Sequence, residues 1–202
     1  MPKATAMNEM TSPRPYRHGN LPNAMRSAAR AILDESGPEG VGLRETARRV
    51  GVSATAAYRH FSSKEDLLAS VAAEGFRELI AAMEAAVNGP DPLIGLGLAY
   101  VEFALQKRGL FRLMFGPILV ERAKYPALNE AADAAFDYVQ RVASGVEGGA
   151  NEESPSAMAA WGLVHGLSAL FIDGLVPESR ARGLAEQILQ AGAPKSEQRP
   201  DA

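Results

Sequence analysis

Basic, hydroxyl-bearing and aromatic side chains gather between residues 44 and 64, where they could act on one partner. Guanidinium and ammonium groups bind phosphate oxygens, and arginine also makes paired hydrogen bonds to a guanine edge. Arg44 and Arg48 are four residues apart, so a helix would place them on one face. Thr55 and Arg59 have the same spacing. Three further side chains can reach phosphate oxygens: Tyr58, His60 and Lys64. This chemistry is typical of a DNA-binding surface.

The residue patterns of common catalytic sites are missing from the sequence. It contains no Gly-x-x-x-x-Gly-Lys phosphate loop, no His-Glu-x-x-His zinc motif and no Gly-x-Ser-x-Gly nucleophile motif. Its three histidines, His18, His60 and His165, lie in separate segments and do not suggest a metal cluster. His165, Ser168 and Asp173 share one segment, and a single helix cannot converge them as a triad. We therefore expect no enzyme, no metal site and no cofactor.

Charge is unevenly distributed along the 202 residues. Residues 1–64 hold ten Lys and Arg against five Asp and Glu, a net of +5, whereas residues 65–202 have a net charge of −8. A basic end on an acidic body suggests that only the N-terminal part approaches a polyanion.

The composition indicates a cytoplasmic protein. There is no cysteine, which excludes disulfides and fits a reducing compartment. The first fifteen residues lack the apolar run of a secretory signal. The uncharged stretch from Ser154 to Ile172 contains a histidine, a proline and three serines, so we expect a buried helix there rather than a membrane span.

Apolar residues recur at helical spacing in almost every long segment, and no segment alternates as a strand would, so we predict an all-α chain. The first helix begins near Leu21 and stops at Gly37-Pro38. The later helices are expected at about 43–50, 54–60, 63–87, 92–108, 110–122, 126–144, 155–175 and 177–191. The Gly-, Glu- and Ser-rich stretch from 145 to 156 is predicted to be an exposed loop.

Two serines could cap the fourth helix. Ser62 with Glu65 would form one capping box, and Ser63 with Asp66 would form a weaker one. Both place the start of the helix within one residue of Lys64, so the choice between them stays open at this point.

The second and third helices have the spacing of a helix-turn-helix, with Gly51-Val52-Ser53 as the turn. Ala47 is small where the helices must approach closely. Gly51 can adopt a turn conformation that a Cβ would strain. Ser53 can cap the third helix and present its positive N-terminus outward.

The run Val52-Ser53-Ala54-Thr55-Ala56-Ala57-Tyr58-Arg59-His60-Phe61, followed by Ser63-Lys64-Glu65, resembles the signature of the TetR family of bacterial transcriptional regulators. The segments 43–51 and 19–21 fit the same family, and the resemblance covers about residues 17–68. It implies an N-terminal three-helix DNA-binding domain, at 17–64, and a C-terminal helical domain for ligand binding and dimerisation, at 65–191. Residues 1–16 and 192–202 would be disordered tails.

The resemblance assigns roles to the DNA-binding residues. Tyr58, His60 and Lys64 would contact the DNA backbone. Base edges would be faced by Ala54, Thr55, Ala56 and Arg59, with Arg44 reaching in from the second helix. The sequence departs from the family pattern at Thr55, where glycine is frequent, at Ala56 and Ala57, which are smaller than usual, and at Gly42, where Ser or Thr often caps the second helix. These departures bear on the operator sequence and leave the fold unchanged.

The C-terminal half carries a second resemblance. Trp161, His165 and Gly166 resemble the W-x-x-x-H-G pattern of one TetR-type C-terminal domain, which implies that the helices at about 155–191 form a four-helix dimer interface with a second copy. A pocket for an apolar ligand would be lined by Tyr100, Phe103, Phe111, Met114, Phe115, Trp161 and His165. His165 or Tyr100 would be its polar anchor. Each of these side chains could equally be an ordinary core residue.

These features predict a repressor that a small, largely apolar effector releases from a palindromic operator. One alternative is a ligand-independent regulator or activator, whose C-terminal half would be packed without a cavity between Phe111 and Trp161. A remote alternative is an enzyme whose resemblance to the family is accidental.

Overall fold

The computed structural model describes residues 20–144 and 155–192. Every regular element in those ranges is helical, which confirms the predicted fold class. The N-terminal helices are α1 (Leu21–Gly40), α2 (Leu43–Val50), α3 (Ala54–Tyr58) and α4 (Lys64–Ala86). They are followed by α5 (Pro92–Gln106), α6 (Arg108–Met114), α7 (Pro117–Val120), the 3-10 helix η1 (Arg122–Lys124), α8 (Pro126–Ser144), α9 (Pro155–Ile172) and α10 (Glu178–Gly192). The tails predicted at 1–16 and 192–202 and the loop predicted at 145–156 fall largely outside the described residues.

The first helix is interrupted where the sequence predicts its end. Gly37 has φ 69° and ψ −176°, a conformation that breaks the helical path, and Pro38 starts one further turn that reaches Gly40. The predicted stop at Gly37-Pro38 is therefore confirmed as a kink in α1.

The structure selects Ser63 as the cap of α4. Its hydroxyl oxygen accepts a hydrogen bond from the Asp66 amide at 3.1 Å. The Asp66 carboxylate in turn accepts hydrogen bonds from the Ser62 amide and hydroxyl, at 2.8 and 3.0 Å. Both serines thus fix the start of α4, but only Ser63 bonds to the backbone of its first turn.

The prediction of a single helix at 110–122 is wrong. The structure has α6 ending at Met114 and α7 beginning at Pro117. Pro117 lacks an amide hydrogen and disfavours helical geometry at the preceding residue. A Cβ at that residue, Gly116, would lie 2.6 Å from the Arg112 carbonyl oxygen, so the chain turns too tightly there for any larger residue.

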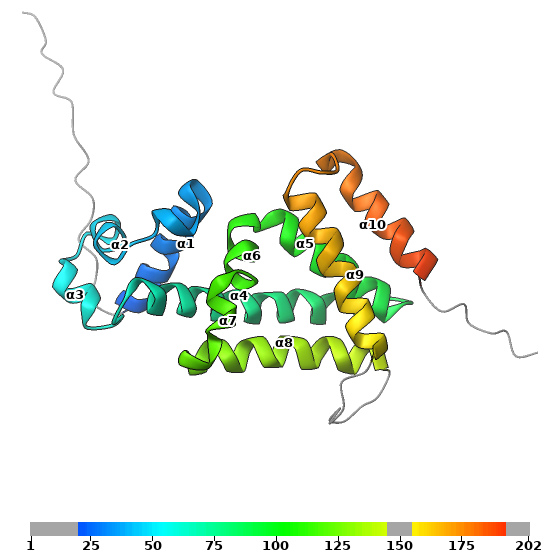
Figure 1. The fold of residues 1–202 in the computed structure, drawn as a ribbon, viewed down its shortest axis with the longest axis horizontal. Helices are drawn as coiled ribbons and strands as arrows, with labels where there is room; N and C mark the ends of the chain where they lie inside the picture. Colours follow the sequence, from blue (N-terminus) through cyan, green and yellow to red (C-terminus); the bar gives the residue numbers. More distant parts are fainter. Residues whose placement is uncertain (1–19, 145–154, 193–202) are drawn as a thin grey trace, which may run out of the picture.

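Helix α4 is the axis of the molecule. Figure 1 shows α1–α3 at one end of α4, and α8 running along its other part. The α4 residues Leu67, Val71 and Leu79 are fully buried. One continuous apolar core extends from α1–α3 along α4 to α8 and α9, so α4 joins the helix-turn-helix mechanically to the C-terminal helices.

Ion pairs hold α1 against α4. Arg26 pairs with Glu74, and Arg30 pairs with Glu78, which also binds Lys107 at the junction of α5 and α6. The Glu78 carboxylate therefore joins α1 to the α5–α6 junction.

Helix α9 is less buried than the sequence predicts. It is the one helix in the described ranges that is long and apolar enough to cross a membrane, but a single such helix is weak evidence because helices of soluble proteins pass the same test. Only 33% of its residues are buried within the chain. Its remaining apolar surface faces outward, including Leu163 and Leu170.

Candidate DNA-binding surface and ligand cavity

The turn between α2 and α3 has the geometry that a helix-turn-helix requires. Gly51 ends α2 with φ 78°, in the left-handed region, and the next amide, of Val52, donates to the Ala47 carbonyl oxygen at 3.0 Å. The Ser53 hydroxyl caps α3 by accepting from the Ala56 amide at 3.2 Å. Ala47 and Ala57 are buried where α2 and α3 pack.

The residues predicted to contact DNA lie on α2, on α3, in the turn after α3 and at the first position of α4. The side chains of five of them are exposed: Arg44, Thr55, Tyr58, Arg59 and His60. Ala54 and Ala56 are half-buried. Helix α3 ends at Tyr58, two residues earlier than predicted, so Arg59 and His60 lie in the following turn.

The Lys64 side chain is held in place by Glu39, at the end of α1. Its Nζ donates to the Glu39 carbonyl oxygen at 3.2 Å and lies 3.9 Å from the Glu39 carboxylate. This contact places the ammonium group between the end of α1 and the start of α4. Its predicted contact with the DNA backbone stays a prediction, as do the other DNA roles.

The arginines of α2 differ in their partners. Arg48 binds Glu45 at 2.7 Å, and Arg49 joins Glu45 to Glu35 of α1. Hydrogen bonds from Arg48 and Arg49 lower the pKa of Glu45 to about 2. Arg44 has no ion-pair partner within residues 20–144 and 155–192, and Arg59 has none there either. Their predicted contacts with base edges stay predictions.

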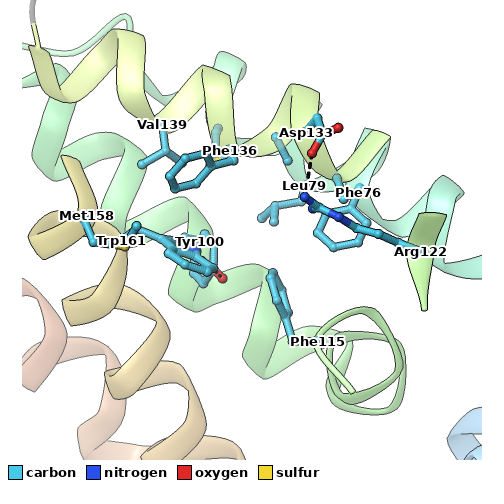
Figure 2. Close-up of a pocket in the computed structure, with 13 residues that line it drawn as sticks. Phe76, Leu79, Tyr100, Phe115, Arg122, Asp133, Phe136, Val139, Met158 and Trp161 are labelled. Carbon is cyan, nitrogen blue, oxygen red and sulfur yellow. Dashed lines mark hydrogen bonds and ion pairs between the residues drawn. The ribbon is translucent and has the colours of Figure 1, made fainter. Parts of the chain in front are cut away.

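A cavity of about 210 Å³ lies among α4, α5, α8 and α9. Figure 2 shows aromatic side chains around it and an ion pair, Arg122 with Asp133, on one side. Three of the predicted pocket residues line it: Tyr100, Phe115 and Trp161. The other four predicted residues, Phe103, Phe111, Met114 and His165, are not part of its lining.

The four residues outside the lining are part of the surrounding core or half-buried beside it. Phe103, Phe111 and Met114 are almost fully buried in the core. The Phe111 ring stacks on His165 with ring centroids 5.4 Å apart. His165 touches the lining from outside: its ring meets the ring of Phe115 with centroids 4.7 Å apart, and its Nδ1 is hydrogen-bonded to Tyr100.

Tyr100 is the centre of a buried hydrogen-bonded group. Its hydroxyl lies 3.0 Å from Nδ1 of His165 and accepts from Nε1 of Trp161 at 3.3 Å. Burial raises the pKa of Tyr100 and lowers the pKa of His165, so both side chains are neutral at pH 7. The predicted polar anchor of the pocket is thus already bonded within the protein.

Sequence reasoning missed the cavity lining from α4 and α8 and one residue of α9. The larger of these residues are Phe76, Leu79 and Met83 on α4, Phe136 and Val139 on α8, and Met158 on α9. The α4 members are spaced three and four residues apart, which is the signal that puts them on one helix face. The ion pair of Arg122 with Asp133 had no comparable signal, because the two residues lie on different elements.

One face of α9 has no partner within the described part of this chain. Leu163 and Leu170 are exposed on it, and Gly162 and Gly166 lie in the same stripe. A Cβ built on either glycine would meet nothing within 4 Å, and the same holds for Gly183 on α10. The face is therefore flat, apolar and open to close approach by another helix.

The chain matches known families over both halves. Residues 26–71 match the family described as bacterial regulatory proteins, tetR family. Residues 93–191 match the family described as tetracyclin repressor-like, C-terminal domain. The W-x-x-x-H-G subtype stays a prediction.

One curated relative and several solved structures are similar to the chain. An uncharacterized HTH-type transcriptional regulator from Bacillus subtilis, YobS, is 29% identical over 87 residues, which are 42% of this chain and 46% of the relative. The match therefore spans about half the length of that relative.

Among solved structures, a protein with unknown function from Rhodococcus sp. RHA1 is 29% identical, with a TM-score of 0.70 over 89% of this chain and 98% of that one. The TetR family transcriptional regulator PfmR from Thermus thermophilus is 23% identical, with a TM-score of 0.54 over 82% and 94% of the two chains, and shows the shared fold. With both of its halves matched and its helix-turn-helix formed as the family requires, the chain belongs to the TetR family of bacterial transcriptional regulators.

Proposed function

We propose that the chain is a dimeric repressor, released from a palindromic operator by a small, largely apolar ligand. The observation that carries this proposal is the double role of α4. The helix begins at Lys64 beside the helix-turn-helix and lines the cavity with Phe76, Leu79 and Met83. A ligand that moves α4 would therefore move the DNA-binding part.

The proposed dimer uses the open face of α9 together with α10. Exposed apolar side chains such as Leu163 and Leu170 cost free energy in water, and a second copy would cover them. Two-fold symmetry would present two α3 helices to successive major grooves about 34 Å apart. The operator is accordingly a palindrome.

The cavity favours a ligand-responsive repressor over the main alternative, a ligand-independent regulator. A regulator without a ligand would have a packed C-terminal half, whereas a cavity of about 210 Å³ lies against Phe115 and Trp161. Its apolar and aromatic lining suits a hydrophobic ligand. The enzyme alternative would require turnover by a protein that has no affinity for DNA.

The experiment is selection of genomic fragments by the purified full chain, followed by sequencing. We expect enrichment of a palindromic site, bound by a dimer with an affinity that falls steeply as salt rises. The double variant Arg59→Ala/Lys64→Ala is the control and should enrich nothing. Lack of enrichment by the wild type, or affinity that is indifferent to salt, would overturn the proposal.

The sign of regulation needs a second measurement. In vitro transcription from a promoter that carries the selected site should fall when the protein is added. A rise in transcription would replace the repressor with the activator alternative.

A further inference from the structure

We propose that the ligand is a monocyclic aromatic carboxylate whose ring occupies the cavity and whose carboxylate binds Arg122. This inference rests on the proposed function, because it names the chemical class of the effector. It is carried by the position of the free polar groups around the cavity, by its size and by its aromatic walls.

The inner end of the cavity offers little to a polar ligand group. The Tyr100 hydroxyl is hydrogen-bonded to both His165 and Trp161, and its residue is 1% exposed. The neighbouring lining residues Leu79, Met83 and Val139 are hydrocarbon or thioether. A ligand must therefore place an apolar part at this end.

The charged groups lie on the other side, as Figure 2 shows. Arg122 and Asp133 are the two charged residues that line the cavity. Nη2 of Arg122 lies 2.9 Å from Oδ1 of Asp133. Both side chains are partly exposed, at 39% and 48%, so this side of the cavity is open to solvent.

Among the described residues, Arg122 is the member of this ion pair that has hydrogen-bond donors left free. Asp133 accepts from Nδ2 of Asn129 through its second oxygen, at 2.9 Å, so both carboxylate oxygens have partners. A guanidinium carries five N–H donors in a fixed plane, and among the described residues Arg122 has Asp133 as its one ionic contact. The free donors match a carboxylate, which accepts two parallel hydrogen bonds from arginine.

The size of the cavity suits a ligand part of about one ring. An apolar cavity of about 150 Å³ takes up benzene, so about 210 Å³ accommodates a benzene ring with a short substituent.

The walls favour a ring over an alkyl chain. Phe76 and Phe115 meet edge to face with centroids 5.3 Å apart, and Phe136 meets Trp161 in the same way at 5.5 Å. A ligand ring can extend these contacts, because aromatic pairs gain from edge-to-face and offset geometry beyond their buried area.

The test is calorimetric titration of the full chain at pH 7.5 with 4-propylbenzoate and with 4-propylbenzamide, its neutral counterpart of the same shape. We expect the carboxylate to bind at least tenfold more tightly than the amide. Arg122→Gln should weaken carboxylate binding at least tenfold and change amide binding less than twofold. Equal binding of both compounds by the wild type, or no binding of either at millimolar concentration, would overturn the inference.

Arg112→Gln is the matched control. Arg112 pairs with Asp173 at 2.8 Å and does not line the cavity, so this variant should bind both compounds as the wild type does. Asp133→Asn removes the competing carboxylate and should raise the affinity for 4-propylbenzoate at least threefold. A gain cannot arise from misfolding, whereas a loss in this variant would overturn the inference.

Operator binding separates this inference from the proposed function. A protein that binds its palindrome but does not prefer the carboxylate contradicts only the ligand class. A protein that prefers the carboxylate but binds no operator contradicts the proposed function and leaves Arg122 as the carboxylate-binding residue.

Discussion

Arg59 and Lys64 are both cationic, but their surroundings predict different roles on DNA. Arg59 is exposed in the turn after α3, whereas Lys64 is held against the end of α1 by Glu39. Arg59→Ala should cost about 1–3 kcal/mol of operator binding and relax the preference at one base pair per half-site. Lys64→Ala should weaken binding to all sequences alike and flatten the dependence on salt. Binding titrations on operator variants at several salt concentrations measure both effects.

The two variants control for each other. Equal loss of sequence preference in both would mean that Lys64 also reads bases and that the predicted register is wrong. Arg48→Ala offers a further comparison, because its guanidinium is bonded to Glu45 and should contribute less to base preference than Arg59.

At the residue level, the sequence predicts exposed residues of a short motif better than the lining of a cavity. Tyr58, Arg59 and His60 are consecutive, so one helix and its turn determine their exposure. Arg122 and Asp133 meet only because η1 folds against α8, and their spacing in the chain carries no helical signal. The sequence predicts His165 or Tyr100 as the polar anchor of the pocket, but tertiary packing joins His165 and Trp161 to the Tyr100 hydroxyl.

At the element level, Gly51 and Gly42 flank α2 in different conformations, which predicts opposite effects of substitution. Gly51 has φ 78°, and a Cβ there would meet no atom within 4 Å, so Gly51→Ala should cost about 1–2 kcal/mol from backbone strain alone. Gly42 is extended, with φ −153°, and gives α2 no side-chain cap. Gly42→Ser should add that cap and stabilise by a few tenths of a kcal/mol. Urea denaturation measures the free energy of unfolding of both variants.

Because neither change adds a clash, the comparison isolates backbone and capping effects. A Gly51→Ala variant as stable as the wild type would mean that the turn relaxes out of the left-handed conformation. In that case operator affinity should fall even though stability does not, because α3 would be tilted from α2.

The sequence predicts a helix boundary correctly where a single residue determines it. Ser53, Ser63 and Gly51 act through their own backbone or side chain, and the structure has them at the expected termini. The break between α6 and α7 depends on Gly116 and Pro117 together, and an apolar pattern that continues across them concealed it. Apolar periodicity indicates which face of a helix is buried. It gives no signal where one short helix ends and the next begins in a new direction.

At the scale of the whole molecule, the open face of α9 predicts a substitution that would disrupt the proposed dimer. Leu163→Glu would place a carboxylate on that face, where a second copy would bury it without a partner. We expect a folded monomer with a circular dichroism spectrum like that of the wild type and operator affinity reduced at least a hundredfold. Val120→Glu is the control, since Val120 on α7 is 88% exposed and lies away from α9, and this variant should stay dimeric. Sedimentation velocity gives the oligomeric state. If the Leu163→Glu variant is dimeric, the dimer interface does not lie on this face of α9.

The proposed coupling between ligand and DNA would act through α4 as a rigid rod. Its 23 residues, Lys64–Ala86, extend about 34 Å at a rise of 1.5 Å per residue. The helix begins at Lys64 beside the helix-turn-helix and lines the cavity as far as Met83. A ligand wedged against Phe76 and Leu79 would tilt α4 and change the separation of the two α3 helices in the dimer. Linkage then requires ligand and operator to weaken each other by the same factor, which we expect to correspond to roughly 1–3 kcal/mol.

Trp161→Ala tests this coupling, because Trp161 lines the cavity but lies on α9, distant from the DNA-binding surface. Removing its ring enlarges the cavity and breaks the hydrogen bond to Tyr100, so the ligand should fit less tightly and push less on α4. We expect operator affinity without ligand to stay within twofold of the wild type, and release by 4-propylbenzoate to need at least tenfold more compound. Operator binding is measured with and without the compound after sedimentation has shown that the variant is dimeric. If the dimeric variant is released from the operator at the wild-type concentration of 4-propylbenzoate, Trp161 is not part of the ligand sensor. The movement of α4 would then have to originate in a different part of the C-terminal helices.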